Sequence, residues 1–174
     1  MHLVWEIEYQ AHSGRAQVHA VSRVVGPVSG STDDPTIVAL ACCAFTYRFW
    51  VQMLTDREGR IIVLNVLPDC SLLPWTPAPA TDGLAVSWLR LTHRVAGQWP
   101  DLEVGFADGR TAIDQSGVGL VEPIVRAGLT SGEGVYDLVV ADSAIHGIRL
   151  MHEAQTSSAG DPRASSGAAA IRSE

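Results

Sequence analysis

The chain has 174 residues, of which 47% are hydrophobic and 18% are charged, a composition typical of one globular domain rather than of a disordered or fibrous chain. The formal net charge is -7 at pH 7 and no basic cluster offsets it, which argues against binding to the phosphate backbone of DNA or RNA. All 12 basic residues are Arg. Because Schiff-base catalysis, pyridoxal phosphate attachment and the P-loop each need a lysine amine, those classes of site are excluded.

Cysteine usage and the apolar stretches predict a cytoplasmic protein. Three cysteines, Cys42, Cys43 and Cys70, form an odd number, and the first ten residues lack the basic and apolar regions of a secretion signal. Reduced thiols are therefore expected, with the adjacent pair acting as small apolar side chains. The apolar stretch 37–54 is interrupted by Arg48 and is shorter than the roughly 20 residues of a membrane span. Abundant Arg without Lys suggests a high-GC bacterium.

The first elements are predicted to be an antiparallel hairpin. Segment 3–9 alternates polar residues with four apolar ones that would share one face: Leu3, Trp5, Ile7 and Tyr9. A turn at 12–14 then leads into a second predicted strand over 16–25. Residues 26–34 are rich in Gly, Pro, Ser, Thr and Asp and are predicted to be a loop.

Asp34 followed by Pro35 predicts the start of a helix, as an N-cap with proline at the first helical position. The end of that helix is left open between two interpretations. In the preferred one, the helix runs to about Leu54 and a central strand follows over 60–67. In the other, a shorter helix is followed by a hairpin across 56–59, because apolar residues alternate over 45–53.

The middle of the chain contains a proline-dense segment. Four of the nine prolines lie between Leu67 and Leu84, together with apolar residues such as Trp75, so we expect an extended connection that lies against the body of the protein. Residues 84–95 fit a strand or a helix equally. Asp108 and Gly109, between alternating runs, predict a hairpin.

The last third is predicted to contain a short helix from Pro123 to about Gly128, a strand over 136–140, and either a final helix or an edge strand over 143–153. Residues 155–174 are predicted to be disordered, because their Ser, Ala and Gly content offers little apolar surface. No internal repeat of fixed period is visible. The predicted fold is one α+β domain over 1–154, with a mainly antiparallel sheet and two or three helices.

No established catalytic motif can be read in the sequence, so the candidates are single residues. If the protein is catalytic, we expect histidine acid/base chemistry at His93, His146 or His152. His146 and His152 do not share one helical face, and each histidine is more simply read as a hydrogen-bonded or surface imidazole. The five tryptophans indicate either core packing or an aromatic-lined pocket.

Three functional hypotheses follow. The leading one is an enzyme or binding protein for a small apolar organic molecule, acting without a cofactor and closed by segment 68–82. The alternative is a non-catalytic interaction or assembly protein that forms homo-oligomers through surplus apolar surface. The third is a mononuclear metal site built from two histidines and a carboxylate. Its candidate ligands are His19, His93, His146 and Glu153.

Overall fold

The computed structural model describes residues 1–22, 24–70, 76–77, 86–92, 101–114, 116, 119–131 and 136–153. His93, the predicted disordered tail 155–174 and most of the proline-dense segment lie outside these residues. Within them the chain forms a single α+β domain with two helices and a mostly antiparallel sheet, which confirms the predicted fold class. The elements are β1 (His2–Gln10), β2 (Arg15–Ser22), β3 (Gly26–Thr32), α1 (Pro35–Tyr47), β4 (Phe49–Thr55), β5 (Ile61–Cys70), β6 (Thr76–Pro77), β7 (Val86–Thr92), β8 (Asp101–Phe106), β9 (Thr111–Asp114), α2 (Val121–Ser131), β10 (Tyr136–Ala141) and β11 (Ala144–Glu153).

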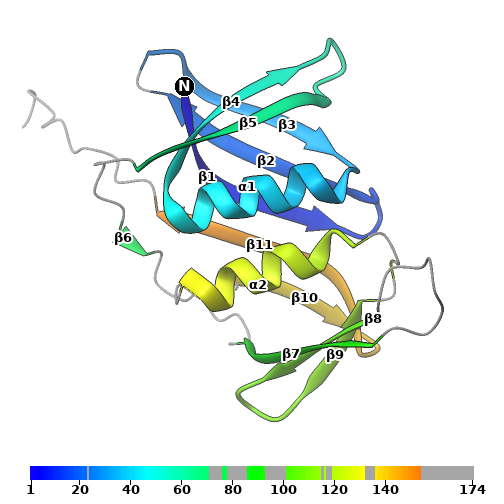
Figure 1. Cartoon of the computed structure of the whole chain (residues 1–174). Coiled ribbons are helices and arrows are strands. Elements are labelled where there is room, and N and C mark those ends of the chain that lie inside the picture. The colour runs from blue at the N-terminus through cyan, green and yellow to red at the C-terminus, as the bar shows by residue number, and fades with distance from the viewer. Residues whose placement is uncertain are drawn as a thin grey trace, which may run out of the picture.

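The centre of the sheet is the antiparallel pair β1 and β11, in which Ile7 lies opposite Leu150. From this pair the strand order runs β3-β2-β1-β11-β9-β8-β7, and the β4–β5 hairpin and β10 branch from the central strands. Both helices pack side by side in front of the central strands (Figure 1). Of the two interpretations of segment 143–153, the strand is confirmed and the helix is wrong. The strand lies inside the sheet rather than at its edge.

The order of elements repeats once along the chain. Three strands, a helix and a hairpin occur as β1-β2-β3-α1-β4-β5 and again as β7-β8-β9-α2-β10-β11, with corresponding elements offset by about 85 residues. In each half a parallel bridge joins the third strand to the start of the last one: Ser31 N donates to Gly59 O at 2.9 Å, and Ile113 N donates to Ser143 O at 2.8 Å. The repeat is one of architecture, and no periodicity of residue types indicates it.

Helix α1 begins where the sequence predicts, but it ends before Leu54, the residue at which the preferred interpretation placed its end. The Asp34 carboxylate accepts from the backbone N–H of Thr36 at 2.8 Å, with Pro35 in the first turn. The helix ends at Tyr47, because Arg48 takes a left-handed conformation with φ of 57° and its N–H donates to carbonyls of the last turn. The helix predicted to extend to Leu54 is therefore wrong. The alternative of a shorter helix and a hairpin is confirmed, because β4 pairs with β5.

The segment 26–34, predicted to be a loop, contains strand β3, which pairs with β2 along its whole length. Its residues have low strand propensity, but the open neighbouring edge supplies hydrogen-bond partners, and tertiary pairing overrides propensity. Position 30 leaves no room for a larger residue than glycine, since a Cβ there would lie 2.5 Å from Ile61 Cγ1. The hairpin at Asp108 and Gly109 is confirmed, with Phe106 N donating to Arg110 O at 2.9 Å.

Other sequence predictions are confirmed with shifted boundaries. The ambiguous segment 84–95 contains strand β7, and α2 begins at Val121, two residues before Pro123. Two parts of the proline-dense segment are described: Pro68 to Cys70 extend β5, and β6 pairs with the end of β11. That pairing places Thr76 and Pro77 against the sheet, as expected for this segment.

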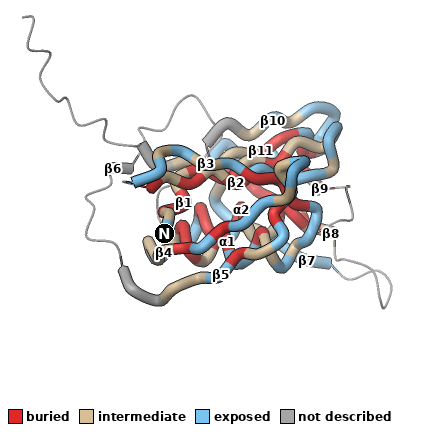
Figure 2. The backbone as a smooth tube through the Cα atoms, turned by 90° about the horizontal axis from the view of Figure 1, so that it is seen from above, coloured by how far each residue is buried: buried red, intermediate tan, exposed pale blue. Residues whose placement is uncertain are grey.

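The core lies between the helices and the inner face of the sheet, where Figure 2 shows the buried residues gathered. Tyr9, Phe45, Leu102, Ile124 and Leu150 are among its largest buried side chains. The predicted alternation of β1 is interrupted at Trp5, because the pairing register with β2 shifts between Val4 and Glu6. Val4 rather than Trp5 therefore packs in the core, with Ile7 and Tyr9. Neither described helix is long and apolar enough to cross a membrane.

Candidate binding groove between the two helices

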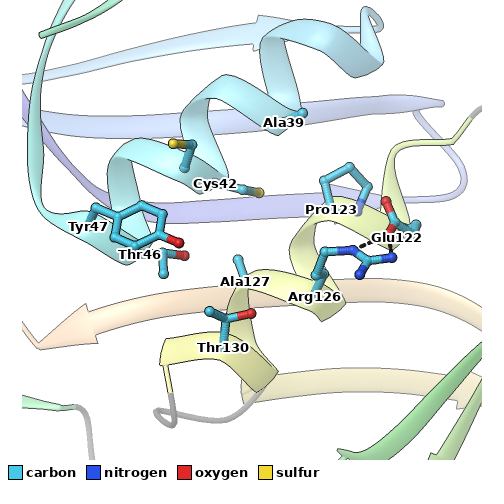
Figure 3. A pocket seen from close by; sticks show the side chains of 10 residues that line it. Ala39, Cys42, Thr46, Tyr47, Glu122, Pro123, Arg126, Ala127 and Thr130 are labelled. Carbon is cyan, nitrogen blue, oxygen red and sulfur yellow. Dashed lines mark hydrogen bonds and ion pairs between the residues drawn. The ribbon is translucent and has the colours of Figure 1, made fainter. Parts of the chain in front are cut away.

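A groove of about 240 Å³ lies where α1 and α2 run side by side, and it opens to solvent (Figure 3). Both helices contribute residues spaced three or four apart, which is the spacing that places side chains on one helical face. Its lining residues are Ala39, Cys42, Cys43, Thr46, Tyr47, Glu122, Pro123, Arg126, Ala127 and Thr130. We call this feature the interhelical groove.

Small and apolar side chains form most of the interhelical groove. Ala39 and Ala127 face the space from opposite helices, and Cys42 is 4% exposed (Figure 3). Such small side chains leave space between two helices that larger side chains would fill. An apolar surface that water reaches only from one side favours ligands with an apolar group of matching size.

The Cys42 thiol is unreactive. Burial raises its pKa far above the ordinary value, and the nearby Glu122 carboxylate and Cys43 thiol raise it further. At neutral pH Cys42 is therefore protonated and acts as an apolar wall, as the sequence predicted for a small buried side chain. Cys43 is also a free thiol and is half-buried.

One ion pair lies at the edge of the interhelical groove. Arg126 Nε donates to Glu122 Oε1 at 2.5 Å, across one turn of α2. The arginine side chain is 58% exposed, so solvent screens the pair and its contribution to stability is small. The main effect of the ion pair is that it holds two charged groups beside an otherwise apolar surface. Thr46 and Thr130 add hydroxyl groups to the lining.

Both helices also carry exposed apolar side chains. Tyr47, at the end of α1, is 55% exposed and stacks on Phe49 with a centroid distance of 5.6 Å. Leu40 on α1 is 38% exposed and Leu129 on α2 is 36% exposed. The exposed surface of the two helices is thus more apolar than a purely solvated helix pair requires.

The structure places the predicted catalytic histidines away from this groove or leaves them undescribed. His146 lies on β11, is exposed, and lines a shallow surface depression with Tyr9 and His12. The backbone of His152 pairs with Pro77, and its side chain is not among the described ones. His93 lies outside the described residues. Their catalytic roles stay predictions.

Of the tryptophans, Trp5 and Trp50 are half-buried, while Trp88 is 42% exposed and packs over Gly105. None of these three is part of the described groove lining. The groove itself could not be read from the sequence, because it depends on which faces of two helices about 85 residues apart come together.

No family model, no curated protein and no solved structure matches this chain.

Proposed function

We propose that the protein binds the apolar part of a small organic molecule in the interhelical groove. The observation that supports this most directly is the lining, in which alanines, a proline, a neutral buried thiol and a tyrosine ring surround one open space. Transfer of an apolar ligand surface from water to such a site contributes roughly 25 cal/mol per Å² of area buried.

The size of the space limits the ligand. Pockets for drug-sized molecules usually enclose about 300–1,000 Å³, whereas the interhelical groove encloses about 240 Å³. A group of the size of toluene or indole, or a short branched chain, fits this volume better than a larger fused-ring compound. Polar atoms of the ligand would face the Thr46 and Thr130 hydroxyls or the Glu122 and Arg126 side chains at the edge.

We favour binding over acid/base catalysis as the activity of this site. Among the described lining residues there is no imidazole, and the Cys42 thiol is held in its protonated form. Glu122 is engaged by Arg126, which leaves the groove better suited to hold an apolar group than to transfer a proton.

Methyl NMR tests the proposal directly. Toluene and indole are titrated into the protein, and we expect saturable shifts at the Ala39, Ala127 and Thr130 methyls. Ala39→Phe should fill the groove and weaken binding by about tenfold or more, equivalent to about 1.4 kcal/mol. Ile62→Phe adds bulk at a position on β5 that is 61% exposed and outside the groove lining, and it should leave the affinity unchanged. Absence of saturable shifts, or equal affinity in both variants, would refute the proposal.

A second candidate function is self-assembly through the same helices. It is supported by the exposed apolar side chains of Leu40, Tyr47 and Leu129. Sedimentation velocity over a range of protein concentrations distinguishes it from ligand binding. A dimer that dissociates in Leu40→Glu, together with no toluene or indole binding in the dissociated variant, would favour assembly over a ligand site.

A further inference from the structure

We propose that Glu6, Glu8 and His19 form a binding site for one divalent transition metal ion such as Zn²⁺. Each residue offers a ligand atom, and these atoms all lie within 4.8 Å of one another. The glutamates alternate along β1 with the core residues Ile7 and Tyr9, so they project from the sheet face opposite the core. This site is independent of the interhelical groove.

The register of the sheet brings the three side chains together. Glu6 lies directly opposite His19 on β2, and His19 lies directly opposite Ser29 on β3. Glu8 is two residues further along β1 and so shares the face of Glu6. The register shift at Trp5 places its ring beside the His19 ring, with centroids 5.9 Å apart. β-bulges often redirect side chains in this way next to functional sites.

His19 is held in an orientation suited to metal binding. Its Nδ1 lies 2.8 Å from the Ser29 hydroxyl oxygen. When Nδ1–H donates to that oxygen, the tautomer carries its lone pair on Nε2, which is the ring atom left to bind an ion. The Trp5 contact further restricts the ring. The third hypothesis from the sequence thus keeps His19 but replaces its partners with Glu6 and Glu8.

The two carboxylates are also positioned by hydrogen bonds. Arg149 on β11 donates to Glu6, which is 4% exposed, and Gln10 donates to Glu8. A carboxylate offers two oxygens and about four lone-pair positions, so each retains acceptor capacity for an ion. Two carboxylates beside one guanidinium leave an excess of negative charge at a partly buried position, and a dication would offset it.

The donor set selects the class of ion. One imidazole nitrogen with two carboxylates suits Zn²⁺ and neighbouring transition metals, whereas Mg²⁺ and Ca²⁺ prefer oxygen ligands alone. Three protein ligands would leave a coordination position for water or for an anionic ligand.

Cobalt and zinc titration of the chelator-treated, untagged protein tests this site. We expect one equivalent of Co²⁺ with a visible d–d spectrum and no thiolate-to-metal charge-transfer band, which separates this site from the cysteines. Zn²⁺ should displace Co²⁺, and excess Mg²⁺ should not. Zn²⁺ should also raise the thermal midpoint, because an ion that binds only the folded chain stabilises it.

Two substitutions make the test specific. His19→Gln and Glu8→Gln should each weaken Zn²⁺ binding by about tenfold or more, a loss comparable to those seen when metal-site groups are removed. Glu58→Gln, at a glutamate that is 72% exposed in the turn between β4 and β5, serves as the control for Glu8→Gln and should keep the affinity of the unmodified chain. Circular dichroism verifies that each variant is folded. Equal affinity in folded Glu8→Gln and Glu58→Gln, unchanged affinity in folded His19→Gln, or no binding of Co²⁺ by the folded parent chain would overturn the proposal.

Discussion

In the first half of the domain, α1 follows β1 to β3 and precedes β4 and β5, and in the second half α2 follows β7 to β9 and precedes β10 and β11, so the order of elements is the same. The two helices bury different side chains. Helix α1 contributes the ring of Phe45, while α2 contributes the branched chains of Ile124 and Val125. The same architecture can therefore be stabilised by different core residues, as long as the volumes between sheet and helix are filled.

The outer faces of the two halves differ more than their cores. On the first half, β1 and β2 present Glu6, Glu8 and His19 as a close polar group. On the second half, β7 and β8 present Trp88 packed over Gly105, with the Arg90 guanidinium carbon 5.9 Å from the tryptophan ring centroid. Core positions are constrained by packing in both halves, whereas the outer positions are free to differ, and it is there that the side-chain chemistry of the halves differs.

The largest expected effect comes from the common core, to which each half contributes side chains. Phe45→Ala should lower the free energy of unfolding by about 3–5 kcal/mol and Ile124→Ala by about 2–5 kcal/mol, because both residues are fully buried. Urea unfolding followed by circular dichroism and tryptophan fluorescence measures both. Since β1 and β11 join the halves, each variant should shift one common transition.

Leu54→Ala, at a side chain that is 49% exposed, is the control and should change stability by less than about 0.5 kcal/mol. Two separate transitions, only one of which moves in Phe45→Ala, would show that the halves fold independently.

A smaller effect is expected from the outer face of the second half. A Cβ at Gly105 would lie 2.0 Å from Trp88 Cε2, so Gly105→Ala should displace the ring and cost about 1–3 kcal/mol of stability. Gly147→Ala is the matched control, because its Cβ would make only an ordinary contact, 3.5 Å from Tyr9 O. Thermal unfolding compares the two. Equal midpoints for both variants would contradict the packing of Trp88 on Gly105.

The smallest expected effect is on the pH dependence of stability, through one turn in each half. The backbone N–H and then the guanidinium of Arg60 lower the pKa of Asp56, and the Arg110 guanidinium and then its backbone N–H lower the pKa of Asp108. A lowered pKa in the folded state means that the stabilisation is present above the ordinary aspartate pKa and is lost as pH falls through the folded value. The Asp56 side chain is 24% exposed and the Asp108 side chain is 42% exposed, so solvent screens both ion pairs and the contribution is small.

Thermal midpoints measured from neutral pH into the acid range check this contribution. The Asp56→Asn and Asp108→Asn double variant should show a slightly weaker decline of the midpoint with acid than the parent chain. Identical acid dependence in the two proteins would mean that these turns do not contribute to the pH dependence of stability.

Features that depend on a few neighbouring residues were predictable from the sequence. Asp34 with Pro35 predicted the start of α1, and Asp108 with Gly109 predicted the hairpin of β8 and β9. Capping and turn formation involve hydrogen bonds across two to four positions, so the residues that make them are adjacent in the chain. The class of fold followed from the same local patterns.

The end of α1, the strand β3, the interior place of β11 and both candidate sites depended on the tertiary structure. Glu6 and Arg149 are 143 positions apart, yet they form an ion pair because β1 and β11 are neighbours in the sheet. Strand pairing satisfies backbone groups whatever the side chains are, so a polar segment such as β3 can form a strand when a partner edge lies beside it. Local residue patterns therefore determined where elements start and turn in this protein, and long-range packing decided which side chains meet.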